Sequence, residues 1–196
     1  MGRRQRTVKT SGDLSGVGLH SGRETTLRVR PAEPGEGVVF VRTDLPGAPR
    51  IRADADHLGV RQRRTALVGP GDAEVHTVEH FLAACMGLGV HNLEVELDGP
   101  ECPGMDGSAR AFVELLDGLE PVEQDAPRDE LRVEETLAVG AGPDRALVAM
   151  PAAEGFSASY TLDYGDAWLG RQAFAFRVTP ESFREQVAGA RTFCLA

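Results

Sequence analysis

Short segments in which apolar and polar residues alternate recur along this chain, and they restrict it to folds that are built on β-sheets. Such alternation puts one side of a strand into a core and leaves the other side in water. Strands that are grouped in this way and followed by helices indicate an α+β fold. The segments, separated by turn-forming glycines and prolines, are residues 24–30, 37–43, 92–97, 132–139, 146–150, 156–162 and 172–178.

Two amphipathic helices are expected in the first part of the chain. Residues 77–88 and 108–119 place apolar side chains three and four positions apart, which is the spacing of one helix face. Thr77 and Ser108 are suitable N-caps, and Gly89 follows the first helix as a C-terminal glycine cap does. These end signals agree with the apolar periodicity.

A charged segment divides the chain. Residues 120–130 contain two prolines and dense charge, with few apolar side chains to bury. This composition is typical of an interdomain linker. We therefore expect an N-terminal domain over residues 1–120, a linker over 121–130 and the first part of a second domain over 131–196. A third helix is expected near residues 180–190.

Charge and composition narrow the classes of partner. The net charge is −9 at pH 7, yet residues 1–64 carry thirteen Lys and Arg against seven Asp and Glu. Such a basic half indicates a solvated face or an anionic substrate, but no aromatic residues are interleaved with it, so nucleic acid is not an expected partner. No apolar run reaches the roughly 18 residues of a membrane span, and we expect a cytoplasmic protein.

A glutamate lies beside a histidine in the segment His76-Thr-Val-Glu-His80. The spacing matches the H-x-x-E-H pattern of zinc proteases, in which two histidines on one helix hold zinc and the glutamate activates water. That hypothesis requires both histidines in one helix. Residues 74–76 resemble the end of a strand, however, which would put His76 outside the helix.

A second hypothesis uses only Glu79 and His80, in the first turn of the expected helix. A carboxylate is favoured there by the helix dipole, and the two side chains could face one cleft. His80 would then bind a metal ion, and Glu79 would take a proton from water. From the residues alone, this hypothesis has about the same weight as a structural one, in which Glu79 caps the helix and His80 packs against the fold.

Five colinear motifs resemble those of one family, the UDP-3-O-acyl-N-acetylglucosamine deacetylases, which are zinc-dependent amide hydrolases of lipid A biosynthesis in Gram-negative bacteria. The resemblance implies two domains, each a two-layer sandwich of a β-sheet and helices, with the active site in the cleft between them. Here it implies a complete N-terminal domain and an incomplete second one. The motifs are Ser15-Gly-Val-Gly-Leu-His-Ser-Gly22, Thr77-Val-Glu-His-Phe-Leu-Ala83, Met105-Asp-Gly-Ser-Ala109, Leu169-Gly-Arg-Gln172 and Ala190-Arg-Thr-Phe193.

The resemblance also implies roles for three residues of this chain. Glu79 matches the general base, and His80 matches one of three protein ligands to the catalytic Zn²⁺. Thr192 matches the threonine whose hydroxyl helps to polarise the amide carbonyl and to stabilise the tetrahedral intermediate. The substrate implied is UDP-3-O-acyl-N-acetylglucosamine, which would lose its N-acetyl group.

Further positions are carried over from the family with less weight. Leu19 and Phe193 fall where the family lines its acyl-chain passage and sugar site, and Tyr164 falls near an aromatic residue that stacks on the nucleotide. Asp106 precedes a helix, so a structural turn aspartate is expected there. His20 lies in a loop near the family's active site without a primary zinc role.

The sequence departs from the family after the last motif. The family's other two zinc ligands, a histidine and an aspartate, follow that motif, and no histidine of this chain follows His91. One ligand is too few for a catalytic zinc site. We therefore expect little activity from these 196 residues alone, with a separately encoded C-terminal half as one way to complete the site. The alternative is a non-catalytic remnant or a UDP-sugar-binding module.

Overall fold

A computed structural model describes residues 4–140, 145–163, 165 and 170–192. Contacts divide these residues into two units. The first unit contains residues 4–128 and 183–192, and the second contains the described residues between 129 and 182. No helix in the described part of the chain is long and apolar enough to cross a membrane.

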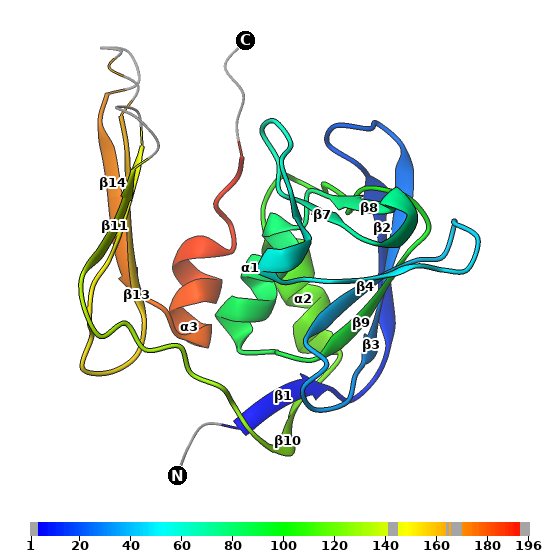
Figure 1. Cartoon of the computed structure of the whole chain (residues 1–196), viewed down its shortest axis with the longest axis horizontal. Helices are drawn as coiled ribbons and strands as arrows, with labels where there is room; N and C mark the ends of the chain where they lie inside the picture. Colours follow the sequence, from blue (N-terminus) through cyan, green and yellow to red (C-terminus); the bar gives the residue numbers. More distant parts are fainter. Residues whose placement is uncertain (1–3, 141–144, 164, 166–169, 193–196) are drawn as a thin grey trace. The chain divides into compact units, whose positions relative to one another are not determined.

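A five-stranded sheet is the largest element of the first unit (Figure 1). Its strands lie in the order β2-β3-β9-β4-β5. All neighbours are antiparallel except β4 and β9, which run parallel. The strands are β2 (Gly12–Val17), β3 (Glu24–Pro31), β4 (Val38–Arg42), β5 (Arg50–Arg52) and β9 (Leu93–Leu97).

The alternation in the sequence decides which face of this sheet is buried. In β9, Leu93, Val95 and Leu97 are fully buried, whereas the glutamates between them point to the other face. There Glu96 forms an ion pair with Arg30 of β3 at 3.0 Å. A charged outer face and an apolar inner face follow from the period of two.

Smaller sheets flank the main one. A three-stranded antiparallel sheet consists of β6 (Leu58–Gly59), β7 (Ala66–Val68) and β8 (Glu74–His76), and the short helices η1 (Ala55–His57) and η2 (Pro70–Asp72) precede two of these strands. Strand β1 (Arg4–Val8) pairs with β10 (Pro121–Pro127) in a two-stranded antiparallel sheet.

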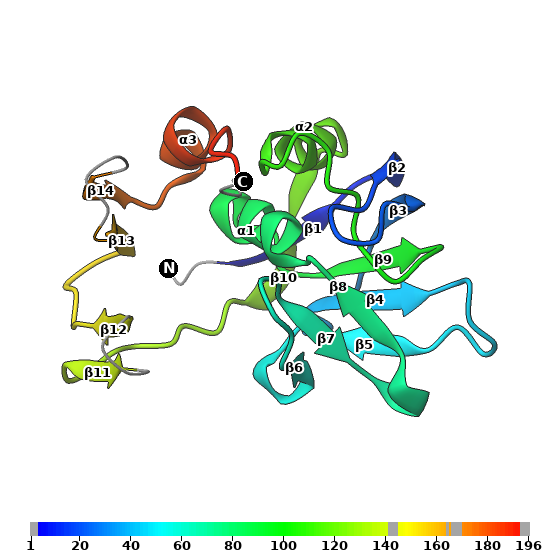
Figure 2. The ribbon, with the colours of Figure 1, turned by 90° about the horizontal axis from the view of Figure 1, so that it is seen from above.

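Two helices, α1 (Glu79–Leu88) and α2 (Arg110–Gly118), cover the apolar face of the five-stranded sheet (Figure 2). They occur where the apolar spacing predicted them, although both start two residues later than expected. Gly89 ends α1 in the left-handed conformation, with φ of 67°. The predicted glycine cap is therefore confirmed.

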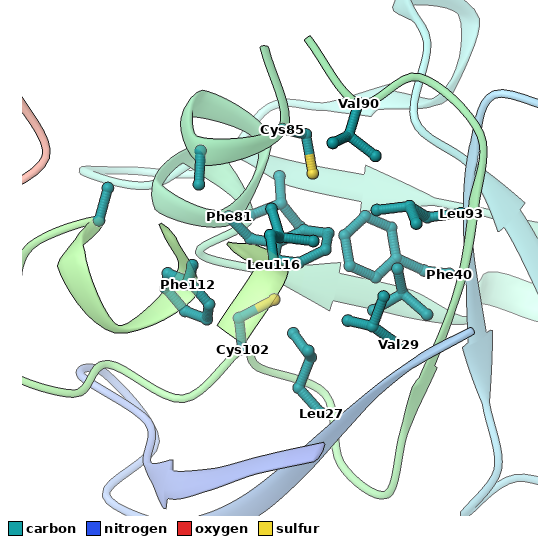
Figure 3. Packing of buried hydrophobic residues seen from close by; sticks show 14 of the residues in the cluster. Leu27, Val29, Phe40, Phe81, Cys85, Val90, Leu93, Cys102, Phe112 and Leu116 are labelled. Atoms are coloured by element: carbon teal, nitrogen blue, oxygen red, sulfur yellow. The ribbon is translucent and has the colours of Figure 1, made fainter. Parts of the chain in front are cut away.

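The core lies between these helices and the sheet (Figure 3). Phe81 of α1 contacts Phe40 of β4 and Phe112 of α2 edge to face, with ring centroids 6.0 and 5.7 Å apart. Edge-to-face packing is the favoured arrangement of aromatic rings. Cys85 and Cys102 are buried in this core, and burial raises the pKa of both thiols. Both are free thiols that pack as small apolar side chains.

The structure has a β-strand over most of the segment in which a linker was expected, residues 121–130. Residues Pro121–Pro127 form β10, whose register with β1 runs from Arg4 opposite Pro127 to Val8 opposite Pro121. The prolines stand at the two ends of the strand, where they remove no central ladder hydrogen bond. A short, exposed strand therefore has the same composition as a linker here, and composition alone does not distinguish them.

The second unit consists of two hairpins. Strand β11 (Leu137–Gly140) pairs with β12 (Ala146–Ala149), and β13 (Ser157–Leu162) pairs with β14 (Gln172–Arg177). All four were predicted, but β11 begins five residues after the expected start at residue 132. Their apolar side chains are largely exposed, including those of Leu137, Val139, Leu147, Val148, Tyr160 and Phe174. The mixture of strands and helices in the chain confirms the α+β class.

The helix expected over residues 180–190 consists of α3 (Pro180–Ser182) and the π-helix η3 (Phe183–Val187). The amide of Ala188 donates to the carbonyl of Phe183 at 2.8 Å, which is the five-residue spacing of a π-turn. Phe183 is 4% exposed and lies against Gly87 of α1. A Cβ on Gly87 would stand 2.3 Å from Cγ of Phe183, so the ring lies directly on the helix backbone.

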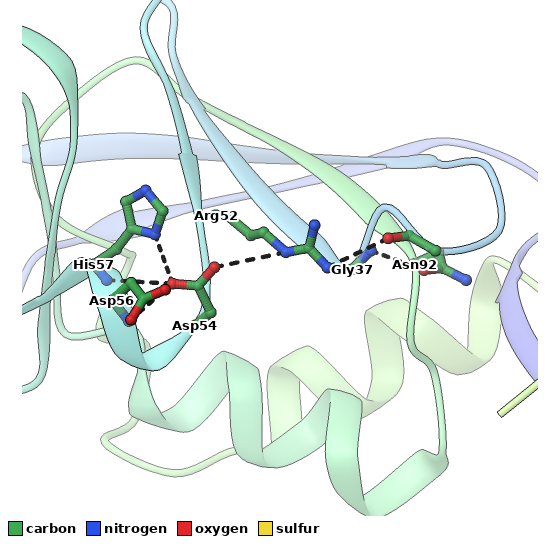
Figure 4. Close-up of polar contacts among 7 residues, drawn as sticks. Gly37, Arg52, Asp54, Asp56, His57 and Asn92 are labelled. Carbon is green, nitrogen blue, oxygen red and sulfur yellow. Dashed lines mark hydrogen bonds and ion pairs between the residues drawn. The ribbon is translucent and has the colours of Figure 1, made fainter. Parts of the chain in front are cut away.

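A cluster of charged side chains surrounds Asp54, before η1 (Figure 4). Its Oδ1 accepts hydrogen bonds from the amides of Asp56 and His57 at 3.1 and 3.2 Å, and Nδ1 of His57 lies 2.6 Å away. The hydrogen bond to His57 lowers the pKa of Asp54. These contacts are those of a helix N-cap, so the cluster serves the fold.

Substitution of Gly87 by alanine should destabilise the first unit. Alanine gains about 1 kcal/mol of helix propensity over glycine, but the collision with Phe183 costs about 1–3 kcal/mol. We expect a lower free energy of unfolding in urea and faster hydrogen exchange at the amide of Ala188. Gly118→Ala is the matched control, because a Cβ at the end of α2 meets nothing within 4 Å. A Gly87→Ala protein at least as stable as Gly118→Ala would contradict this packing.

The stability of the first unit should fall between pH 6.5 and pH 4. Burial, with Arg128 and Arg6 nearby, lowers the pKa of His91 to about 4. The unfolded chain, with a pKa near 6.5 for histidine, binds the proton first as the pH falls. Stability from neutral His91 is therefore complete above pH 6.5 and is lost towards pH 4.

The test replaces His91 by glutamine, whose side-chain carbonyl can still accept the hydrogen bond that Nδ1 receives from the amide of Arg6 at 3.0 Å. The free energy of unfolding of the variant should lose about 1–3 kcal/mol less between the two pH values, after allowance for partial solvent screening. Equal pH slopes for the two proteins would show that His91 does not contribute.

Candidate active site

Glu79 and His80 are the first two residues of α1, and both side chains are half-buried. One carboxylate oxygen of Glu79 accepts a hydrogen bond from the amide of Thr65 at 3.2 Å. Thr65 precedes β7, so the three-stranded sheet and α1 together fix this carboxylate. Its second oxygen has no hydrogen bond within the described residues and can accept one from a ligand or from water.

Thr77 does not cap α1, which corrects the sequence-based expectation. The residue before the helix is Val78, with no side-chain cap. Thr77 is buried instead and has a φ of 57°, a conformation that β-branched residues rarely adopt. Its amide donates to the carbonyl of Thr65 at 2.9 Å, and its hydroxyl donates to Oε1 of Glu101 at 2.8 Å. Hydrogen bonds from both the amide and the side chain of Thr77 therefore fix the turn before Glu79.

Glu101 is a functional candidate that the sequence analysis missed. Its side chain is 1% exposed, and it makes no ion pair within the described residues. It accepts hydrogen bonds from the amide of His20 at 2.9 Å and from that of Ser21 at 2.7 Å, besides the hydroxyl of Thr77. Burial alone would raise the pKa of Glu101, but the hydrogen bonds from Ser21, His20 and Thr77 outweigh it and lower the pKa.

The loop that carries Leu19 and His20 lies against the segment after Glu101. The amide of Gly104 donates to the carbonyl of Val17 at 2.9 Å. A Cβ on Gly104 would stand 2.5 Å from Cγ of Leu19, so the Leu19 side chain lies directly over the backbone there. Leu19 is nevertheless 46% exposed, which leaves apolar surface for a ligand.

Thr192 lies next to the turn that contains Asp106. Its amide donates to the carbonyl of Gly107 at 2.8 Å, and Nε of Arg191 donates to the carbonyl of Asp106 at 2.7 Å. Oδ1 of Asp106 accepts from the amide and hydroxyl of Ser108 at 3.0 and 2.6 Å. The prediction that Asp106 is a turn aspartate is confirmed. Two of the five sequence motifs thus meet through one backbone hydrogen bond and one hydrogen bond from the Arg191 side chain.

The segment 101–108 therefore connects three parts of the candidate site. It contacts the Leu19 loop, the turn before Glu79 and the Arg191-Thr192 segment. Two other predicted site residues, Tyr164 and Phe193, lie outside the described residues. Only Pro100 and Pro103 around Glu101 mark it in the sequence, and nothing there predicts a buried carboxylate.

The two-histidine zinc hypothesis is wrong in its geometry. His76 is the last residue of β8, so it shares no helix face with His80. Its Nε2 pairs with Glu74 at 3.0 Å, and burial, with Arg64 nearby, lowers its pKa. His76 lies outside the helix because it belongs to β8, which pairs with β7 and ends before α1 starts.

The side chains in the described part of the chain do not add up to a set of metal ligands around His80. No group of three or more histidine, cysteine, aspartate or glutamate residues is placed to hold a metal ion in that part of the chain. The described residues therefore do not form a metal site by themselves.

Comparisons with known proteins agree with the motifs. The sequence pattern of the family described as UDP-3-O-acyl N-acetylglycosamine deacetylase matches residues 5–196. A UDP-3-O-acyl-N-acetylglucosamine deacetylase of Myxococcus xanthus is 41% identical over 96% of this chain and 59% of its own length. One from Bdellovibrio bacteriovorus is 38% identical over 96% of this chain and 62% of its own.

A third relative, the bifunctional enzyme LpxC/FabZ of Chlorobaculum tepidum, is 39% identical over 97% of this chain and 40% of its own length. The chain thus spans less than two thirds of each of these three relatives. The matched range, residues 5–196, covers Glu79, His80, Glu101 and Thr192. By this match and by its identity to curated relatives, the chain belongs to the UDP-3-O-acyl N-acetylglycosamine deacetylase family.

Proposed function

We propose that this chain supplies the general base and one metal ligand for removal of the N-acetyl group from UDP-3-O-acyl-N-acetylglucosamine, in lipid A biosynthesis. The substrate is the one that the names of the relatives give. The observation that carries the proposal is the position of Glu79, a half-buried carboxylate with one oxygen held by Thr65 and the other without a hydrogen bond within the described residues. The cytoplasmic location expected from the sequence is part of the proposal.

Glu79 is proposed to accept a proton from the attacking water. A carboxylate that is fixed through one oxygen keeps the other in a constant direction, which is what proton transfer in a transition state requires. Thr192 is proposed to donate its hydroxyl to the developing oxyanion. Its amide is anchored on Gly107, and its side chain is exposed, so a substrate can reach it.

His80 is the one described residue that we propose as a zinc ligand. A catalytic zinc site uses three protein ligands, and the described residues gather no such group. We propose that the remaining ligands come from polypeptide outside the described residues, and that the 196-residue chain hydrolyses the substrate poorly by itself. The alternative function, a non-catalytic UDP-sugar-binding module, is favoured by the same lack of a ligand group.

Zinc binding should depend on completion of the protein. We expect weak binding by the chain alone, and about one tightly bound zinc ion when the part of the Myxococcus xanthus relative outside the match is supplied. His80→Ala should abolish tight binding in the complemented sample, whereas His76→Ala should retain it. Metal analysis and calorimetry measure both. Tight zinc binding by the His80→Ala protein would exclude His80 as a ligand.

Replacement of the base should remove hydrolysis while binding is retained. In the complemented sample, Glu79→Gln should lower the rate of acetate release by about 10²- to 10⁴-fold, which is the usual contribution of a general base. The glutamine carbonyl can still accept from the amide of Thr65, so the fold and zinc content should not change. Glu96→Gln, on the outer face of β9, is the control and should retain activity. A fully active Glu79→Gln protein would exclude Glu79 as the general base, whereas a complemented wild-type protein that releases no acetate would favour the binding-module alternative.

A further inference from the structure

Glu101 is a buried carboxylate whose hydrogen-bond donors come from two distant segments of the chain. We propose that Glu101 is a positioning residue, which fixes the Leu19–Ser21 loop and the turn before Glu79 relative to each other. The proposal deepens the proposed function, because it rests on Glu79 being the base. The positioning itself is independent of any metal or substrate.

The chemistry of the contacts requires an ionised acid at this position. A carboxylate only accepts hydrogen bonds, and its two oxygens can take several donors at once. Oε1 receives the amide of His20 and the hydroxyl of Thr77, while Oε2 receives the amide of Ser21. Glutamine has the same shape, but its amide group would point donors at donors. The donors therefore select for charge as well as for shape.

The backbone of Glu101 is fixed independently of its side chain. Residues 100 and 102 on either side of it pair with His76: the amide of His76 donates to the carbonyl of Pro100 at 2.8 Å, and the amide of Cys102 donates to that of His76 at 3.0 Å. Glu101 thus extends from a strand-like segment at the edge of β8. A carboxylate on such a fixed support can hold two separate segments in one geometry.

The loop behaves as one piece that is attached at Glu101. The amide of Gly18 donates to the carbonyl of Arg23, and the amide of Gly22 donates to that of Gly18, at 2.9 and 3.0 Å. A Cβ on Gly18 would stand 2.5 Å from Oε2 of Glu101, so only glycine admits the carboxylate this close. The loop that presents Leu19 is therefore attached to this side chain, in addition to the hydrogen bond between Gly104 and Val17.

The other partner of Glu101 is under backbone strain. Thr77 has a φ of 57°, which a β-branched residue adopts only where its surroundings hold it. The hydrogen bond from its hydroxyl to Glu101 is one of the two contacts that hold it, and Val78 and Glu79 follow directly. Loss of that bond lets Thr77 relax and turns the start of α1. Glu101 thus couples the loop to the base through a strained residue.

Amide hydrogen exchange of the chain itself, measured by NMR, tests this coupling. In Glu101→Gln, one of the two acceptor oxygens becomes an NH2 donor, so at least one of the amides of His20 and Ser21 loses its acceptor and should exchange faster by about tenfold. The amides of Leu27 and Val95 in the core should not change. Asp98→Asn is the matched control: Asp98 accepts one backbone hydrogen bond, from the amide of Thr26 at 2.7 Å, and it contacts neither segment.

A second pair of variants distinguishes a positioning role of Glu101 from a general loss of stability. It tests the proposal even if Glu101→Gln fails to fold. Thr77→Val removes only the hydroxyl, yet it should accelerate exchange at His20 and Ser21, which lie more than fifty positions away in the sequence. Thr77→Ser keeps the hydroxyl and should restore the wild-type rates.

Unchanged rates at His20 and Ser21 in Thr77→Val, or an equal acceleration of core and loop amides, would overturn the proposal. Neither zinc nor substrate is needed, so failure of the deacetylase proposal leaves this result interpretable by itself. Conversely, a protein that binds zinc and hydrolyses substrate with an uncoupled loop would reject only the positioning role.

Discussion

The parallel pairing of β4 with β9 is the constraint from which the candidate site follows. Parallel neighbours cannot be joined by a tight turn, so the chain between them must cross over the sheet. This crossover carries the three-stranded sheet and α1, and it brings Glu79 and His80 to the start of a helix that packs on the core face. The segment that contains Glu101 leaves the end of β9 directly afterwards. Glu79 and Glu101 are therefore placed by one topological feature.

Burial divides the charged residues of the first unit into two kinds. The outer face of the sheet carries ion pairs such as that of Arg30 with Glu96, which are exposed and contribute little to stability. Glu101 carries its charge inside the protein with neutral donors alone, which is costly unless every contact is satisfied. A buried charge of this kind is often no more stabilising than well-packed apolar residues, which agrees with the positioning role proposed for Glu101.

The sequence predicted the parts of the fold that depend on local periodicity. Alternation located β3, β4 and β9, and the helical spacing located α1 and α2, because burial on one face acts residue by residue. Pairings between distant segments were missed. Strand β10 was interpreted as a linker, since its partner β1 lies more than a hundred residues away and its composition is that of an exposed strand.

The residues of the candidate site also differ in whether a local sequence pattern predicts them. Glu79, His80 and Thr192 were found through motifs, and the structure places their backbones. Glu101 was missed because its role depends on donors from three positions that no local pattern connects, and the strained backbone of Thr77 has no signature in the sequence either. Contacts of this kind become visible only when the segments are brought together in space.

The packing of Phe183 on Gly87 has a consequence for biosynthesis. The chain leaves the first unit after Arg128 and returns at Phe183, so the second unit is an insertion in the sequence of the first. Proteins emerge from the ribosome in order from the N-terminus. The sheet and both of its covering helices are therefore synthesised long before the segment that covers α1 and carries Thr192. Until that segment emerges, the face of α1 around Gly87 lacks the cover that Phe183 provides in the folded protein.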